Sequence, residues 1–149
     1  MQVGEFCNRE VVVAGREITV ADAAKLMRRH HVGDIVIVEN EEGPPVPVGI
    51  LTDRDIVVEL LANDVDVRIL TLGEVMTFDL ITVREDEDIF RALKQMKNHG
   101  VRRIPVVDGQ RKLAGILAVD DLIELIAEQL GDLITLFRRQ ELREKEQRS

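Results

Sequence analysis

The sequence predicts an α+β fold made of two pseudo-symmetric β-α-β-β-α repeats that pack against each other, followed by an extended C-terminal helix. The first observation is an internal repeat, because a shift of 69 positions aligns Val3-Gly4-Glu5-Phe6 with Leu72-Gly73-Glu74-Val75. After Asn40 the shift becomes 66, and it aligns Gly49-Ile50-Leu51 with Gly115-Ile116-Leu117. The second observation is length, since a copy of about sixty residues buries too little surface to be stable alone. We therefore expect the two copies to share one core.

The first copy carries the predicted elements of the repeat in order. They are a strand over Val11–Val13, a helix over Thr19–Arg29, strands over Asp34–Glu39 and Val48–Leu51, and a second helix over Asp53–Leu61. The core face of the first helix is predicted to contain Val20, Ala23, Ala24 and Met27. The loop around Glu41-Glu42-Gly43-Pro44-Pro45 holds the three residues by which this copy is longer.

The second copy repeats this order. Its predicted elements are Leu80–Val83, Asp88–Lys97, Ile104–Val107, Ala114–Leu117 and Asp120–Leu130. We divide the chain into a first repeat over residues 3–63, a linker over 64–71, a second repeat over 72–130, and a C-terminal helix with a charged tail over 131–149.

The C-terminal stretch predicts a helix that is longer than the repeat requires. Its apolar residues recur at helical spacing, at Leu122, Ile126, Leu130, Leu133 and Phe137. This stripe can cover the chain's own core, dock on a second subunit, or lie on a membrane, and the mixed-sign charges over 138–146 make the membrane the weakest choice. Gly131 is a candidate position for a bend, because glycine costs about 1 kcal/mol inside a helix.

Composition argues against two classes of partner. The 20 basic and 28 acidic residues give a net charge of -8, and only 3% of residues are aromatic. A nucleic-acid binder needs a basic surface, often with aromatic stacking platforms, so we expect no nucleic-acid binding. The apolar runs are shorter than the about 18 to 20 residues that cross a bilayer, so we expect no membrane span. A lone Cys7 and the absence of a signal-peptide pattern favour the cytoplasm.

We expect no metal site, no catalytic site and no cofactor. His30 and His99 occupy the same repeat position, His31 is adjacent to one of them, and no cysteine pair completes a zinc site. Asp53 and Asp55 are the conceivable acid and base, but the sequence offers neither an activated nucleophile nor a base with an orienting partner.

The order and spacing of these segments resemble a tandem CBS domain protein, from about Val3 to about Glu128. The most specific segments are Gly49-Ile50-Leu51-Thr52-Asp53-Arg54-Asp55-Ile56 in the first copy and His99–Asp108 in the second. Leu72–Thr77 resembles the segment that joins the halves of such proteins. The resemblance implies that the repeats pack through their sheets, that the module is regulatory, and that it forms a homodimer.

The segment from Leu51 to Asp55 is the main candidate for ligand binding. A strand followed by a helix near Asp53 puts Thr52 at the N-cap, where a hydroxyl and free backbone N–H groups suit a phosphate. The carboxylate of Asp55 can accept hydrogen bonds from vicinal ribose hydroxyls, and Arg54 adds positive charge. The resemblance implies that Thr52 and Asp55 contact an adenine nucleotide. Without it, the same residues describe an ordinary capped helix.

The resemblance further implies two clefts, each between the helix start of one copy and the first two strands of the other. Thr52, Arg54 and Asp55 would then face Ile81, Val101 and Arg102, whereas Asp121 would face Val12, Val32 and Gly33. Ile81 and Val101 would sandwich the adenine. Arg102 and Arg103 would bind phosphate, or else pair with surface acids. Because Ala118 replaces the hydroxyl in the second copy, we expect the Thr52 cleft to bind more tightly.

These expectations describe a regulatory module without catalytic activity that binds AMP or ATP and acts on an unidentified protein. NAD and S-adenosylmethionine share the adenosine portion and are further possible ligands. A ligand that bridges both copies would shift the populations of their arrangements. Two alternatives remain: a structural dimerisation module with vestigial clefts, and a weak nucleotide hydrolase that uses Asp53 or Asp55.

Overall fold

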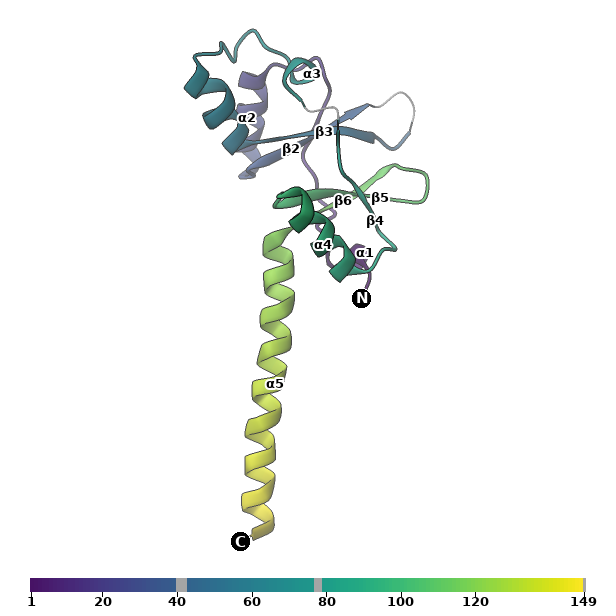
Figure 1. The fold of residues 1–149 in the computed structure, drawn as a ribbon, viewed down its shortest axis with the longest axis vertical. Coiled ribbons are helices and arrows are strands. Elements are labelled where there is room, and N and C mark those ends of the chain that lie inside the picture. The colour runs from purple at the N-terminus through teal and green to yellow at the C-terminus, as the bar shows by residue number, and fades with distance from the viewer. Residues whose placement is uncertain (40–42, 77–78, 149) are drawn as a thin grey trace.

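The chain forms two similar α+β halves and one long helix, and the computed structural model describes residues 1–39, 43–76 and 79–148 (Figure 1). The first half contains α1 (Val3–Phe6), β1 (Val13–Ala14), α2 (Val20–His30), β2 (Asp34–Glu39), β3 (Val46–Thr52), the π-helix η1 (Asp55–Leu60) and the 3₁₀-helix η2 (Leu61–Asn63). The second half contains α3 (Leu72–Val75), β4 (Val83–Arg84), α4 (Ile89–His99), β5 (Arg103–Val107), β6 (Leu113–Ala118) and α5 (Val119–Arg148). The predicted α+β class is confirmed.

Several details differ from the sequence-based expectations. Strand β1 begins at Val13, two residues later than predicted, and β4 begins at Val83, three residues later. Strand β3 begins at Val46, two residues earlier than predicted. The helix after Asp53 widens to π geometry from Asp55 and tightens to a 3₁₀ turn at its end. In α2, Ala24 is exposed, because the buried stripe of this helix follows the spacing of Val20, Ala23 and Met27. Glu41 and Glu42, in the predicted inserted loop, lie outside the described residues.

Each half contains a three-stranded sheet of the same topology. The middle strand, β2 or β5, pairs in parallel with the short first strand and antiparallel with the last one. The register also repeats, because Asp34 pairs with Thr52 in the first sheet and Arg103 pairs with Ala118 in the second. The repeat in the sequence is therefore a repeat in the architecture.

The first long helix of each half is fixed at both ends by local hydrogen bonds. Thr19 Oγ1 accepts from the N–H of Asp22 at 3.2 Å to begin α2, and Asp88 plays the same part for α4. Both helices end in a left-handed residue, His31 with φ 54° and Gly100 with φ 65°. These left-handed residues turn the chain from α2 into β2 and from α4 into β5. They therefore determine the positions of the residues just before each of these strands.

The short helices α1 and α3 are exchanged, since each packs into the core of the other half. Val3 of α1 is fully buried in the second core, and its N–H donates to the carbonyl of Glu87 at 2.9 Å. Leu72 of α3 is fully buried in the first core, and its N–H donates to the carbonyl of Ile18 at 2.8 Å. Neither core is complete without a segment from the other half.

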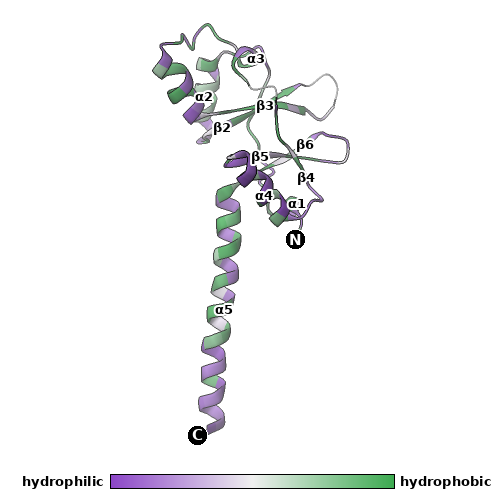
Figure 2. Cartoon of the chain, viewed as in Figure 1, coloured by the Kyte–Doolittle hydropathy of each residue, from purple (hydrophilic) through white to green (hydrophobic). Residues whose placement is uncertain are grey.

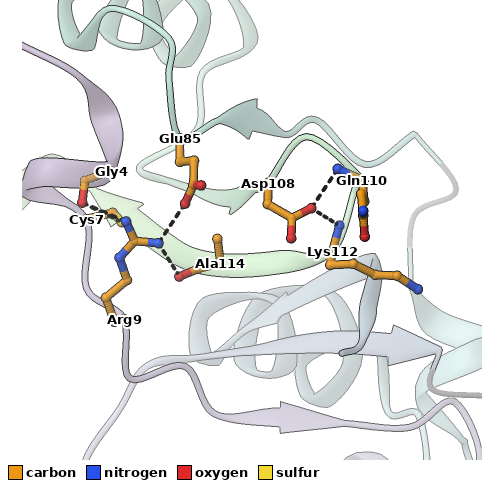
Figure 3. Close-up of polar contacts among 8 residues, drawn as sticks. All are labelled: Gly4, Cys7, Arg9, Glu85, Asp108, Gln110, Lys112 and Ala114. Carbon is orange, nitrogen blue, oxygen red and sulfur yellow. Dashed lines mark hydrogen bonds and ion pairs between the residues drawn. The ribbon is translucent and has the colours of Figure 1, made fainter. Parts of the chain in front are cut away.

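Arg9 fastens the chain that follows α1 to the second half (Figure 3). Its Nη1 donates to Glu85 Oε2 at 2.9 Å and to the carbonyl of Ala114 at 3.0 Å. Its Nη2 donates to the carbonyl of Gly4 at 2.9 Å, within α1 itself. One guanidinium thus ties α1 to two segments of the second repeat.

The two sheets pack against each other through a separate apolar cluster. Its buried members are Val36 and Val38 of β2 and Ile116 of β6. Half-buried residues from both repeats, Val11, Ile50 and Leu113, surround them. The expectation that the repeats pack through their sheets is confirmed.

Helix α5 spans 30 residues and projects away from the two halves (Figure 1). Only Leu122 and Leu125 are buried, and every residue over 126–148 is exposed. The helix continues through Gly131, so the chain has no break at the expected boundary between residues 130 and 131. Across the described residues, no helix combines the length and the apolar character needed to cross a membrane.

The exchange predicts that Leu72→Ala destabilises the whole chain. Truncating a fully buried leucine costs roughly 2 to 5 kcal/mol, and here the lost side chain fills the core of the other repeat. Urea unfolding followed by circular dichroism should show this loss in one transition. The matched control is Leu142→Ala on α5, where the residue is 59% exposed and the cost should stay within about 0.5 kcal/mol. A loss as small for Leu72→Ala as for Leu142→Ala would contradict the exchange.

Candidate functional site

The helical segment after β3 begins with a reciprocal pair of hydrogen bonds between Thr52 and Asp55. Thr52 Oγ1 accepts from the N–H of Asp55 at 3.1 Å, and Asp55 Oδ2 accepts from the N–H of Thr52 at 3.0 Å. This is the geometry of a capping box, in which two side chains satisfy two otherwise unpaired donors. The predicted N-cap position of Thr52 is confirmed.

The backbone N–H groups of this helix start are already engaged. Besides the reciprocal pair, the N–H of Asp53 donates to the carbonyl of Gly33 at 2.9 Å, and that of Arg54 donates to Asp53 Oδ1 at 2.8 Å. The expectation of free N–H groups for a phosphate is therefore wrong, because neighbouring acidic and hydroxyl side chains fold back onto them. The Thr52 hydroxyl still has its own proton to donate, since here it acts as an acceptor.

The second helix start, at the beginning of α5, keeps half of this arrangement. Asp121 Oδ2 accepts from the N–H of Ala118 at 2.8 Å, as Asp55 does from Thr52. Ala118 offers no hydroxyl. The two sites are thus alike in their carboxylate and unlike in their hydroxyl.

Gly33 and Arg102 contact the helix starts of their own repeats. The carbonyl of Gly33 accepts from Asp53, and the carbonyl of Arg102 accepts from the N–H of Val119 at 2.8 Å. The antiparallel pairing of each strand pair explains these contacts, because it returns the chain to the start of its own middle strand. The implied facing of Gly33 with Asp121, and of Arg102 with Thr52, stays a prediction.

One ion pair joins the repeats beside both helix starts. Arg103 Nε lies 2.6 Å from Asp34 Oδ2, with the side chains 31% and 15% exposed. The shift of 69 maps Asp34 onto Arg103, so the pseudo-twofold axis runs between them. The sequence predicted that Arg103 binds a phosphate or else pairs with a surface acid, and it gave Asp34 no role. The repeat alignment could have indicated this ion pair, because it places opposite charges at equivalent positions of the two copies.

Burial raises the pKa of the Asp34 carboxyl above its ordinary value, and the charge and hydrogen bond of Arg103 only partly oppose this shift. The negative charge of Asp53 acts in the same direction as burial. Desolvation therefore outweighs the attraction to Arg103, as is common for enclosed ion pairs. The pair fixes how the two repeats face each other more than it adds stability.

The apolar candidates are all half-buried. Ile81 and Val101 pack on the second core, and Val12 packs on the first. Val32 directly follows the left-handed end of α2. The side chains of Arg54 and Arg102 are exposed. Of the three predicted arginines, Arg103 is the one whose described contacts reach the other repeat.

Other surface features offer less. Two grooves lie at equivalent positions along α4 and α2, and neither contains a predicted site residue. Their lining is mainly long polar side chains, such as Arg91 and Lys94 on α4 and Lys25 and Arg29 on α2. Within the described residues, no three His, Cys, Asp or Glu side chains gather to hold a metal ion.

Comparison with known proteins identifies relatives along most of the chain. The family model of the CBS domain matches residues 3–62 and 72–128. The chain is 33% identical over 142 residues to the CBS domain-containing protein YhcV of Bacillus subtilis, covering 94% of this chain and 97% of that protein. It is 33% identical over 125 residues to the uncharacterized protein MK0525 of Methanopyrus kandleri, covering 84% of this chain but only 62% of that relative.

A solved structure supports the same fold. The CBS domain pair of protein MJ0100, in complex with 5′-methylthioadenosine and S-adenosyl-L-methionine, superposes with a TM-score of 0.76 at 28% identity. The match covers 87% of this chain and 98% of that one.

The raised pKa of Asp34 predicts a specific dependence of stability on pH. The folded protein holds the proton of the Asp34 carboxyl more tightly than the unfolded chain does, and this adds to the free energy of unfolding. That stabilisation is fully present below the unfolded pKa of 3.8 and is lost as the pH rises through the higher pKa of the folded state. Wild type should lose stability relative to Asp34→Asn over that window. Urea unfolding at a series of pH values measures the difference, with Asp132→Asn on α5 as the control for losing one charge. A constant difference between wild type and Asp34→Asn, or one of opposite slope, would contradict the assigned cost of burying this carboxylate.

Proposed function

Because the chain belongs to the CBS domain family, we propose that it is a cytoplasmic regulatory module that binds an adenine nucleotide, AMP or ATP, between its repeats and catalyses no reaction. The observation that carries the proposal is the contact of Arg103 with Asp34 beside both helix starts. A ligand held there touches both repeats at once, which is what a regulatory ligand requires.

The ribose is proposed to bind the carboxylates of Asp55 and Asp121. Each uses one oxygen, Oδ2, to cap its own helix start. A carboxylate has two oxygens and about four lone-pair positions, so each keeps capacity for the vicinal hydroxyls of a ribose. The capping bond also fixes the orientation of the carboxylate before any ligand arrives, which lowers the entropic cost of binding.

The phosphate is proposed to bind through side chains, since the backbone donors near Thr52 are engaged. Thr52 donates its hydroxyl proton, and Arg102 and Arg103 supply guanidinium groups that suit phosphate oxygens. Arg103 must then exchange Asp34 for the phosphate. Because Asp34 is enclosed and its charge is costly to bury, the release of this pair is coupled to ligand binding.

The adenine is proposed to lie against the half-buried side chains of Ile81 and Val101, with Val12 and Val32 as the equivalent wall of the second cleft. Their exposed portions would be removed from water by the ring. The first cleft should bind more tightly, because Ala118 gives the second cleft no hydroxyl.

Regulation is proposed to follow from the exchange of partners at Arg103. With Asp34 paired, the repeats are held in the arrangement described above. With phosphate in place of Asp34, that restraint is gone and the populations of the two arrangements shift by the difference in ligand affinity for each. An unidentified partner protein would bind the two arrangements of the repeats with different affinity.

S-adenosylmethionine is a second candidate, favoured by one observation. Asp34 and Asp53 are close enough for the charge of Asp53 to act on Asp34, so the first helix start is acidic. A sulfonium cation suits such a site better than a phosphate does. NAD remains a further adenosine-containing ligand.

Calorimetric titration tests the proposal with AMP, ATP, NAD, S-adenosylmethionine and 5′-methylthioadenosine. Asp55→Ala should weaken AMP binding at least about tenfold, since a charged hydrogen bond contributes roughly 1.5 to 3 kcal/mol. Asp121→Ala should have the smaller effect. Asp132→Ala on α5 is the matched control and should leave the affinity unchanged.

A second variant separates binding from folding. Asp55→Asn keeps an oxygen that can cap Thr52, so it should fold like wild type and still lose AMP affinity. Absence of heat with every ligand would favour a structural dimerisation module instead. Turnover of ATP that disappears in Asp55→Asn would favour a hydrolase. Tighter binding of S-adenosylmethionine than of AMP would select the second candidate.

A further inference from the structure

The outer part of α5 exposes a continuous apolar stripe. Its side chains are between 44% and 66% exposed, and they are Ile123, Ile126, Leu130, Leu133, Ile134 and Phe137. Along Ile123, Ile126, Leu130, Leu133 and Phe137 the spacing alternates between three and four residues, which is the pattern of a coiled-coil seam. In Figure 2 most of the apolar colouring of α5 lies on the part nearer the two halves, and the C-terminal turns are mainly hydrophilic.

Within the described residues, this part of the helix packs against no other element of the chain. Leu122 and Leu125 dock the first turns on the second core, and from Ile126 onward every residue is exposed. Helices in water take most of their stability from tertiary packing rather than from intrinsic propensity. A long apolar stripe on an unsupported helix therefore indicates a partner surface.

The charges of α5 indicate what that partner is. Residues 119–137 contain five acids, Asp120, Asp121, Glu124, Glu128 and Asp132, and no base. Residues 138–148 contain five bases, at 138, 139, 143, 145 and 148, and three acids. The helix dipole favours acids only within the first turn, so it does not account for acids as far along as Asp132. The helix carries opposite net charge on its two parts and is complementary to itself when reversed.

We propose that α5 pairs antiparallel with α5 of a second copy of this chain. In that orientation the acidic part of each helix lies along the basic part of the other, whereas a parallel pair would place like charges side by side. The seam then has a definite register, with Leu130 opposite Leu133 and Ile126 opposite Phe137. This register also brings Glu124 near Arg138 of the partner subunit. The pairing uses a surface apart from the ligand clefts and does not depend on ligand.

Sedimentation equilibrium with two matched variants tests the surface. Leu133→Asn removes an apolar residue from the seam, and Leu142→Asn makes the same change outside it, at side chains that are 54% and 59% exposed. Leu133→Asn should weaken self-association at least tenfold, while Leu142→Asn should match wild type. Added salt should weaken the association of wild type, because exposed charge pairs are screened. A monomeric wild type, or equal association of all three proteins, would overturn the proposal.

Distance measurements between spin labels test the orientation. In a Cys7→Ser background, labels at Gln147→Cys should lie about 45 Å apart in the antiparallel pair, from the helical rise of 1.5 Å per residue. Labels at Thr135→Cys, close to the midpoint of the pair along the helix axis but on its outer face, should lie clearly closer together than those at residue 147 and confirm that pairs are present. Short distances at both positions would indicate a parallel pair and would overturn the antiparallel assignment. Unchanged thermal unfolding of the labelled proteins verifies that the fold is intact.

Discussion

The structure depends on one constraint, which is that neither repeat can complete its core alone. Val3 is fully buried in the second core and Leu72 in the first, although each belongs by sequence to the other copy. Each repeat has only three short strands and two longer helices, so a missing buried side chain is a large fraction of its interior. The exchange of α1 and α3 supplies that side chain. It also fixes the two sheets face to face, so the helix starts of both repeats come to the same region.

The chemistry of the candidate site follows from this placement. A contact between equivalent positions, Asp34 and Arg103, lies on the pseudo-twofold axis, where a ligand can touch both repeats. The helix starts beside it are capped by their own side chains, which fixes the carboxylates of Asp55 and Asp121. We therefore propose that hydroxyl and guanidinium groups, rather than backbone N–H groups, bind the phosphate. In this account the enclosed ion pair is the element that a ligand changes, because its burial is costly and one of its partners can be replaced.

The sequence was sufficient for the order of elements and for the cap at Thr52, because both depend on nearby residues. Thr52 precedes a helix and stands three residues before an acid, and this local pattern determines its hydrogen bond. Other features depend on distant contacts. The alignment of Val3 with Leu72 shows that they are equivalent but not which core receives each. The N–H groups of Asp53 and Arg54 were expected to be free, and only the approach of Gly33 and the side chain of Asp53 show why they are not.

The most direct test of ligand binding between the repeats is nuclear magnetic resonance on protein with labelled methyl groups, titrated with AMP. In the proposed complex Thr52, Ile81 and Val101 line one cleft, so their methyl signals should shift together with a common saturation curve. The signals of Ile134 and Leu136, exposed on the outer part of α5, should stay in place. Shifts confined to α5, or no shift at millimolar AMP, would contradict the claim that an adenine nucleotide binds where the two repeats meet.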